Sequence, residues 1–308
     1  MADQSTEDRA ELVTLIKDLL GEAACAYVQN KNRGGSNGKK GTRFEDFYTV
    51  FQVAKLACAN LDKLSAWPSL ESQILAFVDD LVISETSKKQ YFQLKNVASL
   101  VWDGGEHPLA EDFRLQFALS TKLNEPSPTM TLVVADPELK ARMEEKMPSD
   151  IEGFSSVEYF PDGQGSLNKL VFDSEELRDV LVPLARKVQP SYADLEGVFG
   201  VLMVGCLRHS GQISIDAVLR SAKECIPNML AALDVVDVKQ HVTNEFVSTL
   251  DSIPGLAYAF DKGIFSWTAF GTSAVFGVDC ASEEFKQFQN TVVKQQPKTF
   301  DEFEGLLP

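Results

Sequence analysis

The chain of 308 residues is 44% hydrophobic and 24% charged, which excludes a disordered or fibrous protein and allows one large domain or two smaller ones. Its 45 acidic and 29 basic residues give a formal net charge of −16. That surplus argues against broad, non-specific adhesion to DNA or to anionic membranes, although a local basic cleft can lie on an acidic body.

The cysteine pattern and the N-terminal segment predict a cytoplasmic protein. The cysteines are odd in number, widely spaced and without a CxxC pair, which is typical of reduced core thiols: Cys25, Cys58, Cys206, Cys225 and Cys280. Residues 2–11 are polar and do not resemble a signal peptide. No apolar run reaches the ~18 residues that a membrane span needs.

The N-terminal part predicts a helix followed by a basic loop. Leucine, isoleucine and alanine recur at helical spacing over residues 7–29, with Gly21 weakening the middle. Residues 29–43 contain glycines and no apolar residue, which predicts a mobile loop. Its spacing does not fit a phosphate-binding P-loop. A merely solvated loop and a phosphate-binding loop both stay open, and the helix that follows directly favours a phosphate contact. The basic residues are Lys31, Arg33, Lys39, Lys40 and Arg43.

A second helix is predicted over residues 44–64 from the spacing of its aromatic and small apolar residues. Glu45 lies in its first turn, where an acid also suits the positive end of the helix dipole. After a turn at residues 67–69, an apolar stretch leads into the segment 77–95.

Residues 77–95 predict a β-hairpin with charge at both ends. Apolar runs at 81–83 and 91–94 are joined by a polar connector that carries Lys88 and Lys89. Asp79 and Asp80 precede the first run. Either can be the functional acid and the other a turn residue, and Asp80 is favoured because LVIS follows it directly. On the second run, Gln93 and Lys95 are two residues apart and therefore project to one face.

The remaining elements predict an α/β layer and then a mainly helical region. The expected order after the hairpin is a helix over 110–123, a buried strand over 130–135, a helix over 136–146, and strands over 157–160 and 169–172. Helices follow from residue 173, and then over 192–208, 215–233 and 236–250, with shorter mixed segments over 255–278 and a last helix over 283–293. We therefore expect an N-terminal helix (1–28), an α/β domain (29–173) and a mainly helical assembly or sensing domain (174–308). Residues 209–224 also resemble a helix-turn-helix, although a structural helical hairpin explains them better.

The hairpin carries the groups that metal-assisted phosphodiester cleavage requires. Carboxylate and amide oxygens suit Mg²⁺, and a lysine beside the attacking water favours hydroxide and stabilises charge on the phosphate. Adjacent strands bring Asp80, Gln93 and Lys95 together. An edge-strand lysine that discourages aggregation is the alternative for Lys95.

Residues 29–140 resemble the PD-(D/E)XK nuclease superfamily through four parts of the chain in the same order. These parts are GTRFEDFY with Glu45, Asp79-Asp80, Gln93-Leu94-Lys95 and TLVVADP. More narrowly, they resemble the Mrr-like endonuclease domain of bacterial anti-phage systems of the CBASS and Lamassu type. The resemblance implies a PD-(D/E)XK-like core, Mg²⁺ or Mn²⁺ as cofactor, and Asp80, Gln93 and Lys95 as catalytic residues. It implies metal ligands among Asp79, Asp80, Glu45 and Gln93.

The resemblance implies double-stranded DNA as substrate and protein partners in a defence complex. Candidates for the partner are an SMC-like ATPase and further copies of this chain, and no membrane is involved. Phosphate contacts are expected from Lys31, Arg33, Lys39, Lys40, Arg43, Lys88 and Lys89. The acidity of the chain predicts low DNA affinity before assembly. The alternative is an inactive nuclease-fold adaptor that mediates protein assembly.

Overall fold

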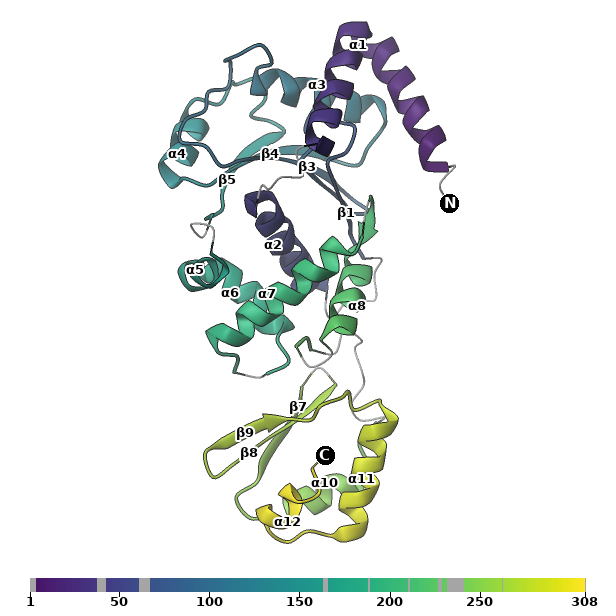
Figure 1. Cartoon of the computed structure of the whole chain (residues 1–308), viewed down its shortest axis with the longest axis vertical. Coiled ribbons are helices and arrows are strands. Elements are labelled where there is room, and N and C mark those ends of the chain that lie inside the picture. Colours follow the sequence, from purple (N-terminus) through teal and green to yellow (C-terminus); the bar gives the residue numbers. More distant parts are fainter. Residues whose placement is uncertain are drawn as a thin grey trace. The chain divides into compact units, whose positions relative to one another are not determined.

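The computed structural model describes residues 4–37, 43–60, 67–162, 166–187, 189–209, 211–226, 229–231, 241–261 and 263–307, of which 4–10, 32–37 and 261 by backbone alone. The protein is a mixed α/β structure with a mixed sheet (Figure 1). It divides into two units, Met1–Gln52 with Ala66–Asp173 and His209–Ile215, and Val53–Ser65 with Ser174–Arg208 and Asp216–Pro308.

The first unit is built on a six-stranded sheet in the order β5-β4-β3-β2-β1-β6. Its strands are β1 (Ser69–Ser72), β2 (Leu81–Ser84), β3 (Lys89–Lys95), β4 (Pro128–Val134), β5 (Ser155–Tyr159) and β6 (Ile213–Ser214). Strand β3 is antiparallel to β2 and parallel to β4, and β4 is parallel to β5. The sheet therefore changes from antiparallel to parallel at β3. The predicted hairpin is confirmed, as are the strands at β4 and β5.

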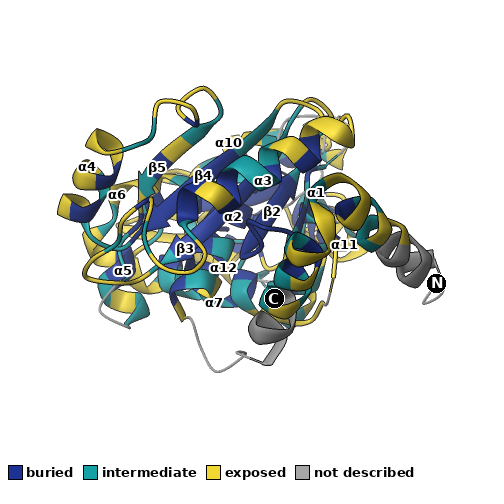
Figure 2. Ribbon diagram, turned by 90° about the horizontal axis from the view of Figure 1, so that it is seen from above, coloured by how far each residue is buried: buried dark blue, intermediate teal, exposed yellow. Residues whose placement is uncertain are grey.

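Helices cover both faces of this sheet, as Figure 1 shows. They are α1 (Gln4–Asn37), α2 (Arg43–Asn60), α3 (Leu109–Lys122) and α4 (Pro137–Glu145). The unit also contains α5 (Leu167–Asp173), which follows β5 in the chain. Tyr91 packs in one core with Phe113 of α3, whereas the Phe92 ring lies 5.6 Å from Tyr48 of α2. Because side chains alternate along a strand, α3 and α2 lie on opposite faces of β3. Figure 2 shows the central strands as the buried layer.

Helix α1 consists of two segments joined at Gly21, whose backbone is non-helical (φ 89°, ψ 168°). A positive φ is tolerated by glycine because it has no Cβ. Ile16 and Val28, one from each segment, share a small core with Phe77 and Leu119. The second segment is therefore packed beside α3, and the helix continues across the domain boundary predicted at residue 28.

Two element predictions in this unit are wrong. Residues 30–37 are helical and not a loop, because the helix is held by the packing of its preceding turns, which overrides the low helix propensity of Gly34 and Gly35. Residues 38–42, the rest of the predicted loop, lie outside the described residues. Residues 169–172, predicted as a strand, belong to helix α5, where Leu170 and Val171 are fully buried.

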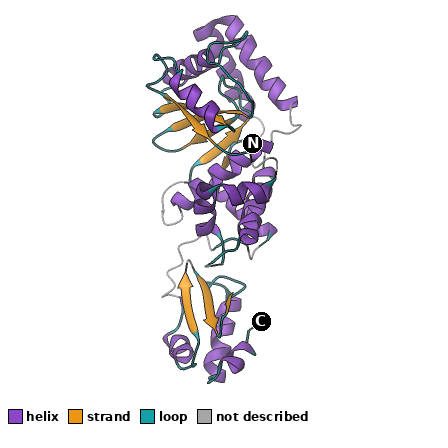
Figure 3. Cartoon of the chain, turned by 90° about the vertical axis from the view of Figure 1, so that its left-hand side faces the viewer, coloured by secondary structure: helices purple, strands orange, loops and turns teal. Residues whose placement is uncertain are grey.

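The second unit holds α6 (Glu175–Leu181), a 3₁₀ helix η2 (Val182–Leu184), α7 (Tyr192–Leu207), α8 (Ile215–Cys225), α10 (Asn244–Asp251), α11 (Glu283–Gln295) and α12 (Phe300–Glu304). It also holds the antiparallel sheet β7 (Ala257–Asp261), β8 (Ile264–Ala269) and β9 (Thr272–Val275), coloured orange in Figure 3. The region is thus not helical throughout. Helix α8 ends at Cys225, earlier than the predicted residue 233, because proline follows at 227. Residues 236–240 of the next predicted helix lie outside the described ranges.

All five cysteines are free, with Cys25 and Cys280 buried and the other three half-buried. Burial raises the pKa of the Cys280 thiol to about 12, which keeps it protonated and unreactive near neutral pH. Within the described ranges, no helix is long and apolar enough to span a membrane.

Close packing of α7 against α8 depends on Gly205. A Cβ at this position would lie 2.6 Å from the Val218 carbonyl oxygen, which is backbone and cannot turn aside. We expect Gly205→Ala to lower the free energy of unfolding by about 1–3 kcal/mol. Gly200 of the same helix has nothing within 4 Å of its Cβ position, so Gly200→Ala should raise stability by about 0.5–1 kcal/mol. Urea denaturation of both variants measures the two changes in unfolding free energy. Changes of the same sign for Gly205→Ala and Gly200→Ala would contradict this prediction.

Candidate functional site

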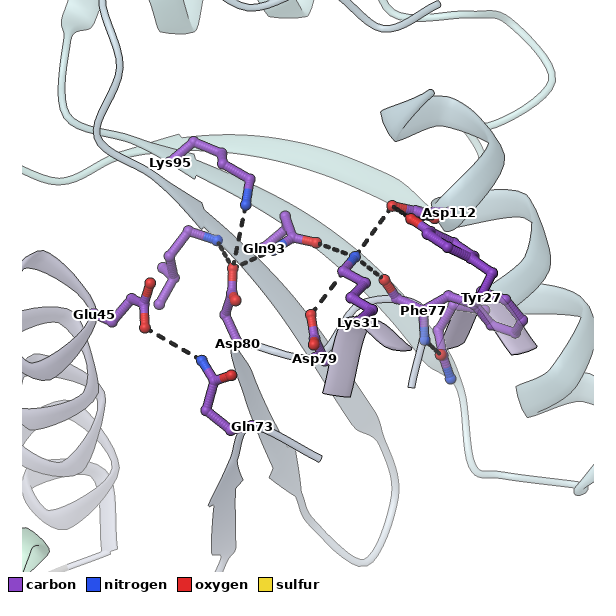
Figure 4. A network of polar contacts seen from close by, with 12 residues as sticks. Tyr27, Lys31, Glu45, Gln73, Phe77, Asp79, Asp80, Gln93, Lys95 and Asp112 are labelled. Atoms are coloured by element: carbon purple, nitrogen blue, oxygen red, sulfur yellow. Dashed lines mark hydrogen bonds and ion pairs between the residues drawn. The ribbon is translucent and has the colours of Figure 1, made fainter. Parts of the chain in front are cut away.

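The hairpin brings Asp80 to the second strand. Leu81 pairs with Phe92, so the residue before β2 lies opposite Gln93. The Asp80 carboxylate accepts hydrogen bonds from the Leu94 backbone N–H, at 2.7 Å, and from the Gln93 side-chain amide. Asp80 is therefore held in place by β3 from two directions, as Figure 4 shows.

Lys95 completes the predicted group of three. Its Nζ lies 3.9 Å from Asp80 Oδ2, and 37% of its side chain is exposed, whereas Gln93 is buried. Lys95 thus contacts the buried Asp80 carboxylate and is itself accessible to solvent. The structure brings together Asp80, Gln93 and Lys95, as the hairpin geometry predicts.

Glu45 lies on helix α2, on the face of the sheet opposite to the one that α3 covers. It belongs to α2, whose aromatic residues pack on the Phe92 side of β3, whereas Gln93 faces α3. Its carboxylate accepts a hydrogen bond of 3.3 Å from Gln73, just after β1. The contacts of Glu45 and of Gln93 therefore lie with different elements.

Lys31, predicted as a phosphate contact in a mobile loop, instead lies on helix α1 and reaches the centre of the site, where protein oxygens occupy its ammonium group. Its Nζ donates hydrogen bonds to the Phe77 carbonyl oxygen at 2.5 Å, to Gln93 Oε1 at 3.1 Å and to Asp112 Oδ2 at 3.1 Å. It also forms an ion pair of 3.6 Å with Asp79 Oδ1. We call these four oxygens, from Phe77, Asp79, Gln93 and Asp112, the oxygen cage. Figure 4 shows the ammonium within it.

Asp112 on α3 was not predicted as a site residue. It is buried, and the Tyr27 hydroxyl donates to its Oδ1 at 2.9 Å. Gln116, one turn later, accepts a hydrogen bond of 3.0 Å from the Phe77 backbone N–H. The sequence signal was polar residues four apart on the same side of α3 as Phe113, where an apolar side chain is normal.

The site is rich in buried negative charge. Burial raises the pKa of Asp79 to about 6, with Lys31 opposing the shift and Asp80 adding to it. Burial also raises the pKa of Asp112, against the opposing effects of Lys31 and the Tyr27 hydroxyl. The site contains three carboxylates, those of Asp79, Asp80 and Asp112, and two ammonium groups, those of Lys31 and Lys95. The Asp79 Oδ1 atom is buried and has no hydrogen-bond partner.

Of the other predicted phosphate contacts, the two lysines of the hairpin tip are paired with acids. At the hairpin tip, Lys88 forms an ion pair of 3.1 Å with Glu85, and Lys89 one of 2.7 Å with Glu125. Arg43 begins α2 and is exposed. The side chains of Arg33, Lys39 and Lys40 lie outside the described residues. On α8, the two basic residues of the helix-turn-helix alternative are paired, Arg220 with Asp216 and Lys223 with Asp279.

The donor types fit a hard divalent cation. Asp79, Asp80 and Gln93 offer carboxylate and amide oxygens, and Mg²⁺ and Mn²⁺ prefer such ligands. A buried carboxylate oxygen without a hydrogen-bond donor, as on Asp79, is the kind of group that a cation satisfies. In the part of the chain that the structure describes, no cluster of three or more histidine, cysteine, aspartate or glutamate residues is arranged as a metal site.

Comparisons of the chain with protein-family models, with curated proteins and with solved structures return no match. The functional argument therefore depends on the chemistry of the site itself.

Proposed function

We propose that the chain is a metal-dependent endonuclease that cleaves double-stranded DNA, and that it acts as an effector subunit of a bacterial anti-phage defence complex. One observation carries the chemistry: Lys95 Nζ lies 3.9 Å from the Asp80 carboxylate, with Gln93 hydrogen-bonded to the same carboxylate. Carboxylate, amide oxygen and lysine at one strand end are the groups that phosphodiester hydrolysis needs.

The order of the elements supports the same proposal. The PD-(D/E)XK superfamily, which the sequence resembles, has a helix, a hairpin with the active residues, and then a helix and a strand. Here α2 is followed by β1, by the β2-β3 hairpin, by α3 and by β4, which pairs in parallel with β3. Asp80 directly precedes β2 and Gln93 lies on β3, an order that supports the proposal.

In this mechanism each side chain has a separate task. Asp80 would hold the metal ion through its carboxylate, with Asp79 next to it. The Gln93 amide, whose nitrogen donates to Asp80 and whose oxygen accepts from Lys31, would turn its oxygen to the ion. When bound, the ion supplies Lewis-acid activation of water and charge stabilisation on the phosphate. Lys95, the most exposed of the group, would orient the attacking water and place positive charge beside the phosphate. The Leu94 N–H keeps the Asp80 carboxylate turned toward β3.

The defence role rests on the resemblance and on charge. A formal charge of −16 disfavours strong DNA binding by the isolated chain. A partner or further copies of the chain would supply the missing basic surface, which suits a toxic nuclease that acts only after assembly.

The test is nicking of supercoiled plasmid in Mg²⁺ or Mn²⁺, by the chain alone and together with the products of the neighbouring genes. We expect Asp80→Ala to lower the cleavage rate by ~10²-fold or more, because it removes a carboxylate from the reacting centre. Asp103→Ala, at an exposed position of the same unit, is the control and should cleave like the wild type. Equal rates for Asp80→Ala and the wild type would disprove the site. No cleavage under any of these conditions would favour the adaptor function.

A further inference from the structure

The oxygen cage around Lys31 has the composition of a cation site. Four oxygens from four residues face one ammonium nitrogen at 2.5 to 3.6 Å. They comprise two carboxylates, one amide oxygen and one backbone carbonyl, which are the ligand types that Ca²⁺, Mg²⁺ and Mn²⁺ take in proteins. The residues that supply the side chains, Asp79, Gln93 and Asp112, are 3%, 1% and 5% exposed.

Lys31 forms hydrogen bonds to only three of the four oxygens of the cage. Asp79 Oδ1 is 3.6 Å from the ammonium, beyond hydrogen-bond distance, and no hydrogen bond reaches that buried atom. An ammonium has three protons and forms three hydrogen bonds here, to Phe77, Gln93 and Asp112. The fourth oxygen is therefore left without a donor, although a metal ion can bind four or more oxygens at once.

The balance of charge points in the same direction. With Lys31 in place, the carboxylates of Asp79, Asp80 and Asp112 exceed the ammonium groups of Lys31 and Lys95 by one charge. Without Lys31 the excess is two, which a divalent cation matches. A buried excess of charge is unfavourable, so the vacated cage would attract such an ion.

Lys31 is carried by an element distinct from those that form the cage. The cage comes from the segment before β2, from β3 and from α3, whereas Lys31 lies on the second segment of α1. That segment is joined to the first at the non-helical Gly21. Displacement of the segment would remove the ammonium and leave all four oxygens behind.

We propose that the oxygen cage is a divalent-cation site for which Lys31 is a built-in competitor. The ammonium fills the cage while α1 is docked, and a metal ion replaces it when the segment withdraws. The inference rests on the proposed function in one respect: Asp79 and Gln93 belong both to the cage and to the group proposed to hold the catalytic metal. The docked lysine would therefore lower the affinity of the nuclease for its metal ion. The cation site itself does not depend on DNA cleavage.

The test is binding of Mn²⁺ to the full chain, measured by the electron paramagnetic resonance signal of the free ion. We expect Lys31→Ala to bind Mn²⁺ at least ~10-fold more tightly than the wild type, because one competing positive charge is gone. The double variant Lys31→Ala/Asp112→Asn should lose that gain, since asparagine keeps one oxygen at this position but loses the negative charge that attracts the ion. Lys17→Ala, an exposed α1 lysine paired with Glu22, is the matched control and should bind like the wild type.

Thermal unfolding with and without Mn²⁺ tests the proposal even if the Lys31→Ala variant folds poorly. We expect Mn²⁺ to raise the melting temperature of Lys31→Ala more than that of the wild type, because the ion binds only the folded cage. A Lys31→Ala chain that stays unfolded in millimolar Mn²⁺ would overturn the proposal. Equal affinities for the wild type and Lys31→Ala, or a gain that survives Asp112→Asn, would also overturn it.

Plasmid cleavage by the same proteins separates this inference from the proposed function. Tighter, Asp112-dependent Mn²⁺ binding without any cleavage would leave the cation site standing and remove the nuclease. Asp80-dependent cleavage by the wild type, with Mn²⁺ affinity unchanged in Lys31→Ala, would leave the nuclease standing and remove the competitor.

Discussion

Lys95→Ala is expected to lower the rate of metal-dependent DNA cleavage by ~10²–10³-fold, the effect of removing one preorganised positive group from a reacting centre. Lys95 points from the β3 end toward the Asp80 carboxylate and is open to solvent, so its loss removes charge beside the phosphate and leaves the hairpin intact. Single-turnover cleavage with saturating enzyme measures this effect separately from DNA binding.

Two further variants distinguish the role of Lys95 from that of any surface lysine. Lys140→Ala removes a lysine of α4 that pairs with Glu144 at the surface, and its rate should stay at the wild-type value. Lys95→Arg keeps the charge but changes its shape, and should retain part of the activity. A rate for Lys95→Ala within about twofold of the Lys140→Ala rate would show that Lys95 takes no part in the reaction.

Phe265→Ala should lower the free energy of unfolding of the second unit by about 3–5 kcal/mol. Phe265 on β8 is fully buried, and rings from α10, α11 and α12 surround it: Phe246, Phe285, Phe288 and Phe303. Truncation removes a large apolar contact and leaves a cavity that rigid rings cannot fill. Chemical denaturation followed by tryptophan fluorescence measures the change, since Trp267, whose ring lies 5.5 Å from that of Phe265, reports on this unit.

Phe270 provides a matched control in the same unit. It is 79% exposed, so Phe270→Ala should change the unfolding free energy by less than about 1 kcal/mol. Similar losses for the two variants would mean that Phe265 is not at the centre of the core.

The sequence predicted the local elements well where one face of a segment is consistently apolar. Helices α3 and α7 and strand β4 begin and end close to the predicted residues. The spacing of apolar residues within each segment is enough to determine which face is buried. Residues 30–37 could not be predicted as helix, because glycines and lysines carry no such pattern. Their conformation follows from contacts of Tyr27 and Lys31 with distant parts of the chain.

The same distinction applies to the candidate site. Asp80 and Gln93 are 13 residues apart and are joined by a hairpin, so their proximity follows from strand pairing. Lys31 is 62 residues from Gln93 and 81 from Asp112, and nothing in the local sequence connects them. Lysine in a glycine-rich stretch predicts full solvent exposure, whereas Lys31 is half-buried, a position that depends on how α1 packs against α3. The sequence therefore indicated the hairpin residues and missed the ammonium placed among them.

The change from antiparallel to parallel pairing at β3 has a consequence for the order of folding. The β2-β3 hairpin closes through a short connector at residues 85–88, an event that takes on the order of 1–10 μs in isolated hairpins. Pairing of β3 with β4 must wait until the connection over residues 96–127, which includes α3, has closed its longer loop. We therefore expect Asp80 and Gln93 to meet while both are still hydrated. Dehydration of the carboxylates comes only when α3 and α1 dock, as a late step of folding.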